Sequence, residues 1–203
     1  MKKVKGRPYY ISAILGFAFL CFSFLVAKLA GEYSSEVAGC SVNDLLLDHI
    51  PLMDVNAIHV YGATLYWVLF FLYVIVQPKM IGCVSKTFSL FILIRAFFNV
   101  LTHLGPPETT LIVPDNIINY YTFTGDLFFS GHVGAPFLAA LIFWDNKLLR
   151  LVNIIFSLFF LVIVLLGGIH YSIDVFSAYF ISYGIYRLSQ ILFLKDYMFF
   201  KSL

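Results

Sequence analysis

Two short segments of the chain place histidines beside residues that can assist them. One runs from Gly125 to His132 and reads GDLFFSGH, and the other runs from Gly167 to Asp174 and reads GGIHYSID. His170 and Asp174 are four residues apart, a spacing that puts them on one face of a helix. A carboxylate there can accept the Nδ1 proton of the imidazole, fix its tautomer and leave Nε2 free to attack. The spacing therefore predicts that His170 is a nucleophile.

The first segment has the composition of an anion-binding helix start. Ser130, Gly131 and His132 open an apolar stretch, where unpaired backbone N–H groups and the positive end of the helix dipole favour a phosphate. The glycine pair 167–168 allows a similar close backbone approach before the last apolar stretch. We expect these two helix starts to form a phosphate cradle. His132 is expected to give a proton to a leaving alkoxide and later to take one from an acceptor, in a two-step transfer through a phosphohistidine.

Further polar residues lie near these two segments in the predicted bundle. Arg95, Asn99 and His103 are spaced by four residues and form one polar stripe on an apolar stretch. Arg95 either contacts phosphate oxygens or is a buried ion-pair partner. His103 is expected to be a helix-end residue. Asp126 either caps the helix that follows it or orients His132, and Asn99 is a second candidate for such an orienting role.

The elements that hold these residues are expected to be membrane-spanning helices. Of the 203 residues, 61% are hydrophobic and 12% are charged, whereas charged residues make up about a quarter of a soluble domain. A backbone in lipid must satisfy its own hydrogen bonds, so apolar stretches of about 20 residues are expected to be helices. The sequence predicts an all-α, single membrane domain over residues 1–203, a bundle of six transmembrane helices at about 9–30, 58–77, 86–104, 127–144, 149–167 and 169–193.

The charge distribution predicts the orientation of this bundle. Lysines and arginines collect before the first span, around the second and fourth loops and at the C-terminus, and acidic residues collect on the other side. The positive-inside rule makes both termini cytoplasmic and puts the histidine segments on the periplasmic or lumenal face. The outer loop at about 31–57 is long enough for a short helix between Val42 and Met53, which either covers the site or rests among headgroups. We expect a multi-pass protein of a bacterial inner membrane, and a net charge of +2 does not suggest a nucleic-acid partner.

The two segments resemble motifs of the phosphatidic acid phosphatase type 2 superfamily of lipid phosphatases and phosphotransferases. The closer likeness is to its sphingomyelin synthase branch, whose members carry a GD-x-x-x-SGH segment and an HY-[ST]-x-DV segment. In this chain they run from Gly125 to His132 and from His170 to Val175. The resemblance implies a triad of His132, His170 and Asp174 with His170 as the nucleophile. It also implies a reaction that needs no metal or cofactor and occurs on the non-cytoplasmic face.

The chain also departs from the wider superfamily. It lacks the Lys-x6-Arg-Pro motif of the soluble and bacterial phosphatases, and apolar residues such as Val164 stand where those enzymes have an arginine before the second histidine. Fewer bases around the phosphate favour a monoanionic phosphodiester over a dianionic monoester, and hence a phospholipid donor. The sequence leaves open whether the acceptor is water or a lipid alcohol, and it leaves the oligomeric state open.

Three other functions fit parts of the pattern. Rhomboid-type intramembrane proteases also place Ser-Gly on the fourth helix and a histidine on the sixth, here Ser130 and His170, although Phe128 stands where their Gly-x-Ser-Gly motif begins. His132, His170 and Asp174 have the ligand types of a catalytic zinc site. A lipid-binding or scrambling bundle without catalysis would leave the same three titratable groups without a purpose.

Overall fold

The computed structural model describes residues 9–108 and 127–202, and all regular structure in these ranges is helical. The elements are α1 (Tyr9–Glu36), α2 (Asn56–Ile75), η1 (Pro78–Met80), α3 (Ile81–Leu101), α4 (Gly131–Ile142), α5 (Lys147–Leu166), α6 (Ser172–Leu192) and α7 (Leu194–Lys201). The prediction of an all-α fold is therefore confirmed for the part of the chain that the structure describes.

Four of these helices are long and apolar enough to cross a bilayer, namely α1, α2, α3 with the preceding η1, and α5. The predicted count of six spans is not confirmed. α4 has 12 residues, about 18 Å of helix, which is shorter than a hydrocarbon core of about 30 Å. α6 has 21 residues, but its serines, its tyrosines and Arg187 make it less apolar than the other long helices.

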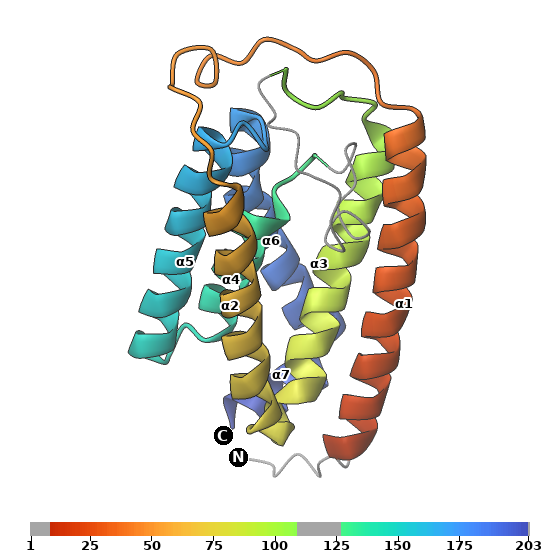
Figure 1. The fold of residues 1–203 in the computed structure, drawn as a ribbon. Coiled ribbons are helices and arrows are strands. Elements are labelled where there is room, and N and C mark those ends of the chain that lie inside the picture. Colours follow the sequence, from red (N-terminus) through yellow and green to blue (C-terminus); the bar gives the residue numbers. More distant parts are fainter. Residues whose placement is uncertain (1–8, 109–126, 203) are drawn as a thin grey trace.

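The helices form an elongated bundle with the two histidine segments toward one end (Figure 1). α1 packs along α3, and α4 packs against both α5 and α6. Residues 37–55, which we call the crossing segment, link α1 to α2 across the end of the bundle where α3 ends and α6 begins. η1 and α7 lie at the opposite end.

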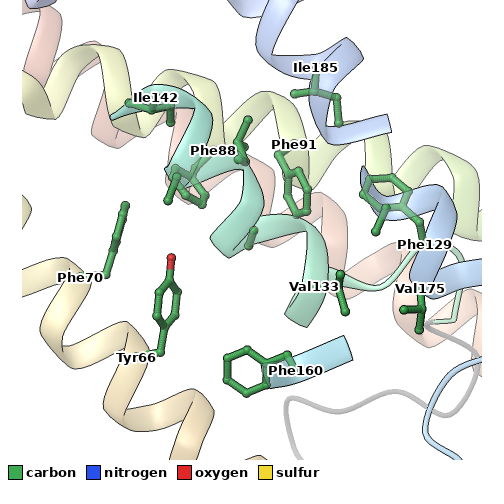
Figure 2. Packing of buried hydrophobic residues seen from close by; sticks show 14 of the residues in the cluster. Tyr66, Phe70, Phe88, Phe91, Phe129, Val133, Ile142, Phe160, Val175 and Ile185 are labelled. Carbon is green, nitrogen blue, oxygen red and sulfur yellow. The ribbon is translucent and has the colours of Figure 1, made fainter. Parts of the chain in front are cut away.

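The interior of the bundle is rich in aromatic rings (Figure 2). Rings from α2, α3 and α5 contact one another, many of them edge to face, which is a favourable arrangement for aromatic side chains. The core includes Tyr66, Phe70, Phe88, Phe91, Phe129, Val133, Ile142, Phe160, Val175 and Ile185.

Large apolar side chains also cover the outside of the bundle. Ile14 of α1, Leu65 of α2, Ile155 of α5 and Phe180 of α6 are all more than half exposed. A contiguous apolar exterior of this kind is unfavourable in water and favourable against lipid chains. Together with the four long apolar helices, this surface indicates a multi-pass membrane protein.

Two helices begin later than their apolar sequences predict. The fourth span was expected from residue 127, but Leu127 and Phe129 are buried in a non-helical segment, and Ser130 is the N-cap of α4. The sixth was expected from residue 169, but α6 begins at Ser172. The Ser130 N–H donates to the Asp174 carbonyl at 3.0 Å, so the two helix starts are joined directly.

Candidate active site

His170 and Asp174 face each other at the start of α6, although only Asp174 is in the helix. His170 precedes the first residue of α6 by two positions, so the pair does not stack on one helical face as the spacing predicts. His170 Nδ1 nevertheless lies 3.6 Å from Asp174 Oδ2. This distance is longer than a hydrogen bond, but it sets the carboxylate against Nδ1 and leaves Nε2 on the far edge of the ring. The exposed fractions of the two residues are 4% and 0%.

The backbone before His170 explains how it enters the bundle. α5 ends at Leu166, and Gly168 has a φ of 59°, in the left-handed region that glycine adopts without strain. The Gly168 N–H donates to the Leu165 carbonyl at 3.1 Å, and the Ile169 N–H donates to the Val164 carbonyl at 2.9 Å. This glycine turn ends α5 and positions the chain so that the His170 side chain is buried.

Asp174 also has a structural role in the same place. Its Oδ2 accepts the N–H of Tyr171, the N-cap residue of α6, at 3.1 Å. A carboxylate three residues into a helix that accepts the N-cap N–H is half of a capping box. Asp174 therefore fixes the start of α6. Its backbone carbonyl accepts the Ser130 N–H, and its carboxylate faces His170.

The start of α4 lies against Arg95 of α3. Arg95 Nε donates to the Phe129 carbonyl at 2.7 Å, and a side chain on Gly131 would begin 3.3 Å from that Nε. Ser130 is fully buried, and its hydroxyl does not cap the helix. The first N–H groups of an α-helix have no acceptor within the helix, so a guanidinium lies here beside N–H groups that α4 itself does not satisfy. Arg95, Ser130 and Gly131 are thus brought together, and phosphate binding by them stays a prediction.

His132, the second residue of α4, lies beside a histidine that the sequence reasoning missed. The ring centroids of His132 and His59 of α2 are 4.3 Å apart with the rings tilted by 56°. His170 is close enough to interact electrostatically with both of these rings, and Arg95 interacts in the same way with His132. The sequence did hold one sign of His59: it is an ionisable residue near the end of an apolar stretch, and such a residue usually has a partner or a function.

The crossing segment reaches the site through Asp44, which is 8% exposed. Its Oδ2 accepts the Ser172 N–H at 2.7 Å, and its Oδ1 accepts the N–H groups of Leu46 and Leu47 at 2.9 Å and 3.1 Å. Burial alone would raise the pKa of the Asp44 carboxyl, but the hydrogen bonds from Leu47, Ser172 and Leu46 outweigh it and lower the pKa below its usual value of 3.8.

This contact corrects the predicted phosphate cradle. Carboxylates of Asp44 and Asp174 already accept the N–H groups of Ser172 and Tyr171 at the start of α6. An anion would be repelled there, so the start of α4 is the stronger candidate for the predicted phosphate binding. The expected helix in the crossing segment is also wrong, because residues 45–49 form turns.

Further backbone bonds hold the crossing segment over this end of the bundle. The buried Tyr171 hydroxyl donates to the Gly105 carbonyl at 2.9 Å and accepts the Val42 N–H at 3.1 Å. The Met53 N–H donates to the Leu166 carbonyl at 2.9 Å. The segment is therefore tied to both sides of the turn that carries His170.

The other predicted site residues lie elsewhere or outside the described ranges. Asn99 is buried, and its carbonyl accepts the Ser34 hydroxyl of α1 at 3.2 Å. His103 follows the end of α3, as predicted, and its ring packs against Tyr33. Asp126 lies outside the described residues, and the N-cap of α4 is Ser130 rather than Asp126.

Four buried polar atoms of the site have no hydrogen-bond partner among the described residues. They are His59 Nε2, Ser130 Oγ, His170 Nδ1 and Asp174 Oδ1. Buried polar atoms in proteins are almost always paired, and exceptions tend to gather where a polar ligand binds. Their concentration at the meeting point of α2, α4 and α6 marks this place as the candidate active site.

Two of the alternative functions gain no support from this geometry. The zinc site would need three His, Cys, Asp or Glu side chains placed to hold a metal ion. In residues 9–108 and 127–202 there is no such group. The rhomboid-type mechanism requires a hydrogen bond between Ser130 and His170, and the Ser130 hydroxyl has no such bond in the described part of the chain.

Comparison with known families points to one superfamily. Residues 124–191 match the family model described as PAP2 superfamily C-terminal, and this range contains Ser130, His132, His170 and Asp174. Over this range, which is about a third of the chain, the match supports a relationship to the PAP2 superfamily. Neither a curated protein nor a solved structure matches the chain.

Proposed function

We propose that this chain is a membrane-embedded lipid phosphotransferase or phosphatase that works through a phosphohistidine on His170. The observation that carries the proposal is the grouping of His170, Asp174 and His132 near Arg95, around buried polar atoms that have no hydrogen-bond partner among the described residues. Three titratable side chains gathered at one partly buried place need a function, and nucleophilic transfer uses all of them.

The first step follows from the orientation of the His170 ring. Asp174 faces Nδ1, so it holds that nitrogen as the protonated one, and Nε2 has the lone pair that attacks phosphorus. The Nε2–P bond forms as the bond from phosphorus to the leaving oxygen breaks. His132 gives its proton to that oxygen, and the alcohol departs uncharged. The 3.6 Å separation shortens when imidazolium character develops on His170, because the carboxylate then attracts a cation.

The second step returns the site to its starting state. Water or a lipid alcohol attacks phosphorus, His132 takes the proton of the attacking hydroxyl, and the P–N bond breaks with its electron pair returning to Nε2. No net electron transfer occurs, and the proton that His132 lost in the first step is recovered. With water as acceptor the enzyme is a hydrolase, namely a phosphatase on a monoester and a phosphodiesterase on a diester, and with an alcohol as acceptor it is a transferase.

The groups around phosphorus favour a phosphodiester substrate. Arg95 contacts the start of α4, whereas the start of α6 carries the carboxylates of Asp44 and Asp174. A monoanion needs less positive charge than a dianion, so one guanidinium and the N–H groups of Gly131 and His132 suit a phospholipid donor. This preference accords with the resemblance to the sphingomyelin synthase branch.

The proposed topology places the site on the periplasmic or lumenal face of a bacterial inner membrane. The crossing segment is rich in acidic residues, and the basic residues 147, 150, 195 and 201 belong to the opposite end of the bundle. The positive-inside rule assigns that basic end to the cytoplasm. All six apolar helices α1 to α6 are proposed to belong to one membrane domain, with α4 and α6 enclosed by the longer helices.

The proposal is tested by following lipids with purified protein in vesicles of phosphatidylcholine, phosphatidylethanolamine and phosphatidylglycerol that contain diacylglycerol. Mass spectrometry reports each lipid that is consumed or formed. The wild-type protein is expected to exchange or release a headgroup, and His170→Ala and His132→Ala are expected to be inactive. His49→Ala is the matched control, because His49 is an exposed histidine of the crossing segment. Wild-type turnover by His170→Ala would contradict the proposal.

A further inference from the structure

His59 is the one histidine near the candidate active site, among the described residues, for which the proposed mechanism has no role. It lies in the first turn of α2, and its ring is tilted against that of His132 with centroids 4.3 Å apart. Its Nε2 is buried and has no hydrogen-bond partner among the described residues. A histidine that served only to fill space would leave this nitrogen desolvated at a cost, which a phenylalanine would avoid.

The surroundings of His59 define the charge it can carry. His132 must be protonated to act as an acid, and a second cation 4.3 Å from it would be repelled. His170 and Arg95 add further positive charge to the same site when His170 is phosphorylated or protonated. A neutral imidazole still has one N–H to donate, so His59 can offer a hydrogen bond without a charge.

We propose, on the basis of the proposed function, that His59 is a phosphoryl-binding residue that donates a hydrogen bond from Nε2 to a non-bridging oxygen of a monoanionic phosphodiester. The donor acts beside the start of α4 and Arg95, and it adds a binding contact without adding charge. This arrangement selects a diester, because a dianionic monoester gains more from a cation than from a neutral donor. The proton of His59 stays on His59 throughout the reaction.

Three substitutions separate donation from packing and from proton transfer. The side-chain amide of His59→Gln reaches the position of Nε2, that of His59→Asn reaches only the position of Nδ1, and His59→Leu has no donor. The expected loss of kcat/KM on the phospholipid vesicles is roughly 10- to 100-fold for His59→Leu and His59→Asn. His59→Gln is expected to stay within about threefold of wild type and to keep its pH profile, because one neutral donor replaces another. His49→Leu is the matched control and is expected to match wild type.

A binding measurement makes the test independent of turnover. Dimethyl phosphate, a monoanionic phosphodiester, is expected to raise the thermal midpoint of the wild-type protein, of His170→Ala and of His59→Gln, and to have a smaller effect on His59→Leu. Wild-type activity and a wild-type effect of dimethyl phosphate in His59→Leu would overturn the inference. An altered pH profile in His59→Gln, with activity as low as in His59→Leu, would overturn it in favour of proton transfer. Wild-type activity in His170→Ala would instead refute the proposed function, and the effect of dimethyl phosphate would still report on His59.

Discussion

Removal of the Asp44 carboxylate is the most informative structural perturbation of the site. Asp44 lies in the crossing segment, yet it accepts the N–H of Ser172 at the start of α6 and two N–H groups of its own turn. In Asp44→Ala, water can reach the N–H groups of the turn at this face, but the bond to Ser172 is lost. We expect a loss of about 2 kcal/mol, at the upper end of the range for a lost N-cap.

The size of the effect can be checked by thermal unfolding in detergent. A loss of about 2 kcal/mol in a chain of this length lowers the thermal midpoint by roughly 4–8 °C. Turnover is expected to fall about tenfold as well, because His170 lies two residues before Ser172 and a small misplacement of a reacting group is costly. Asp48→Ala is the matched control, because Asp48 is an exposed carboxylate in the same turn.

The pH dependence of this effect has a definite sign. The folded-state pKa of Asp44 is lowered, so its contribution to stability is complete above the unfolded value of 3.8 and is lost as the pH falls through the folded value. The difference in midpoint between wild type and Asp44→Ala is therefore expected to be constant from about pH 5 to pH 8 and to shrink below 3.8. Equal midpoints for the two proteins at pH 7 would show that the Asp44 carboxylate does not stabilise the fold.

Three further substitutions test other contacts. Asp174→Asn is expected to lower kcat by about 10²–10⁴-fold. The change in thermal midpoint is expected to be smaller, because the amide oxygen of asparagine can still accept the N-cap N–H. A loss of kcat that only follows unfolding would argue against a role of Asp174 in orienting His170. Gly134→Ala is expected to lower the free energy of unfolding by about 1–3 kcal/mol, since the new Cβ would lie 2.8 Å from the Ser182 hydroxyl of α6. A Cβ on Gly184 would have no atom within 4 Å, so Gly184→Ala is expected to be neutral or stabilising in the same melting assay. Lys86→Met removes the buried ammonium that lies 2.6 Å from the partly buried carboxylate of Asp196. This change is expected to cost about 3–5 kcal/mol, much of it recovered when Asp196→Leu is added.

Much of the fold was predictable because apolar stretches long enough for helices are visible in the sequence. Each of the six predicted stretches overlaps one of the helices α1 to α6. Helix ends were less predictable. Leu127 and Phe129 are as apolar as the helix they precede, yet they form a buried non-helical segment, while α1 continues through polar residues to Glu36. α7 was not predicted because its eight residues mix Lys195 and Asp196 with aromatic residues and show no helical apolar stripe.

The candidate site was predictable where its residues are close in sequence. His170 and Asp174 were paired from their spacing, and they do face each other, although through a capped turn rather than a helical face. Contacts between distant segments left no such signal. Asp44 reaches Ser172 across 128 positions, and His59 meets His132 only because the packing of the bundle brings α2 to the start of α4.

The most direct measurement is identification of the covalent intermediate. The protein is mixed with a headgroup-labelled phospholipid, quenched at alkaline pH within milliseconds to seconds, digested and analysed by mass spectrometry under conditions that preserve acid-labile phosphohistidine. In the wild-type protein the phosphoryl group is expected on His170. In His170→Ala no adduct is expected at position 170, and His49 is expected to stay unmodified in both proteins. A phosphoryl adduct on Ser130 or on another residue in place of His170 would contradict the proposed mechanism.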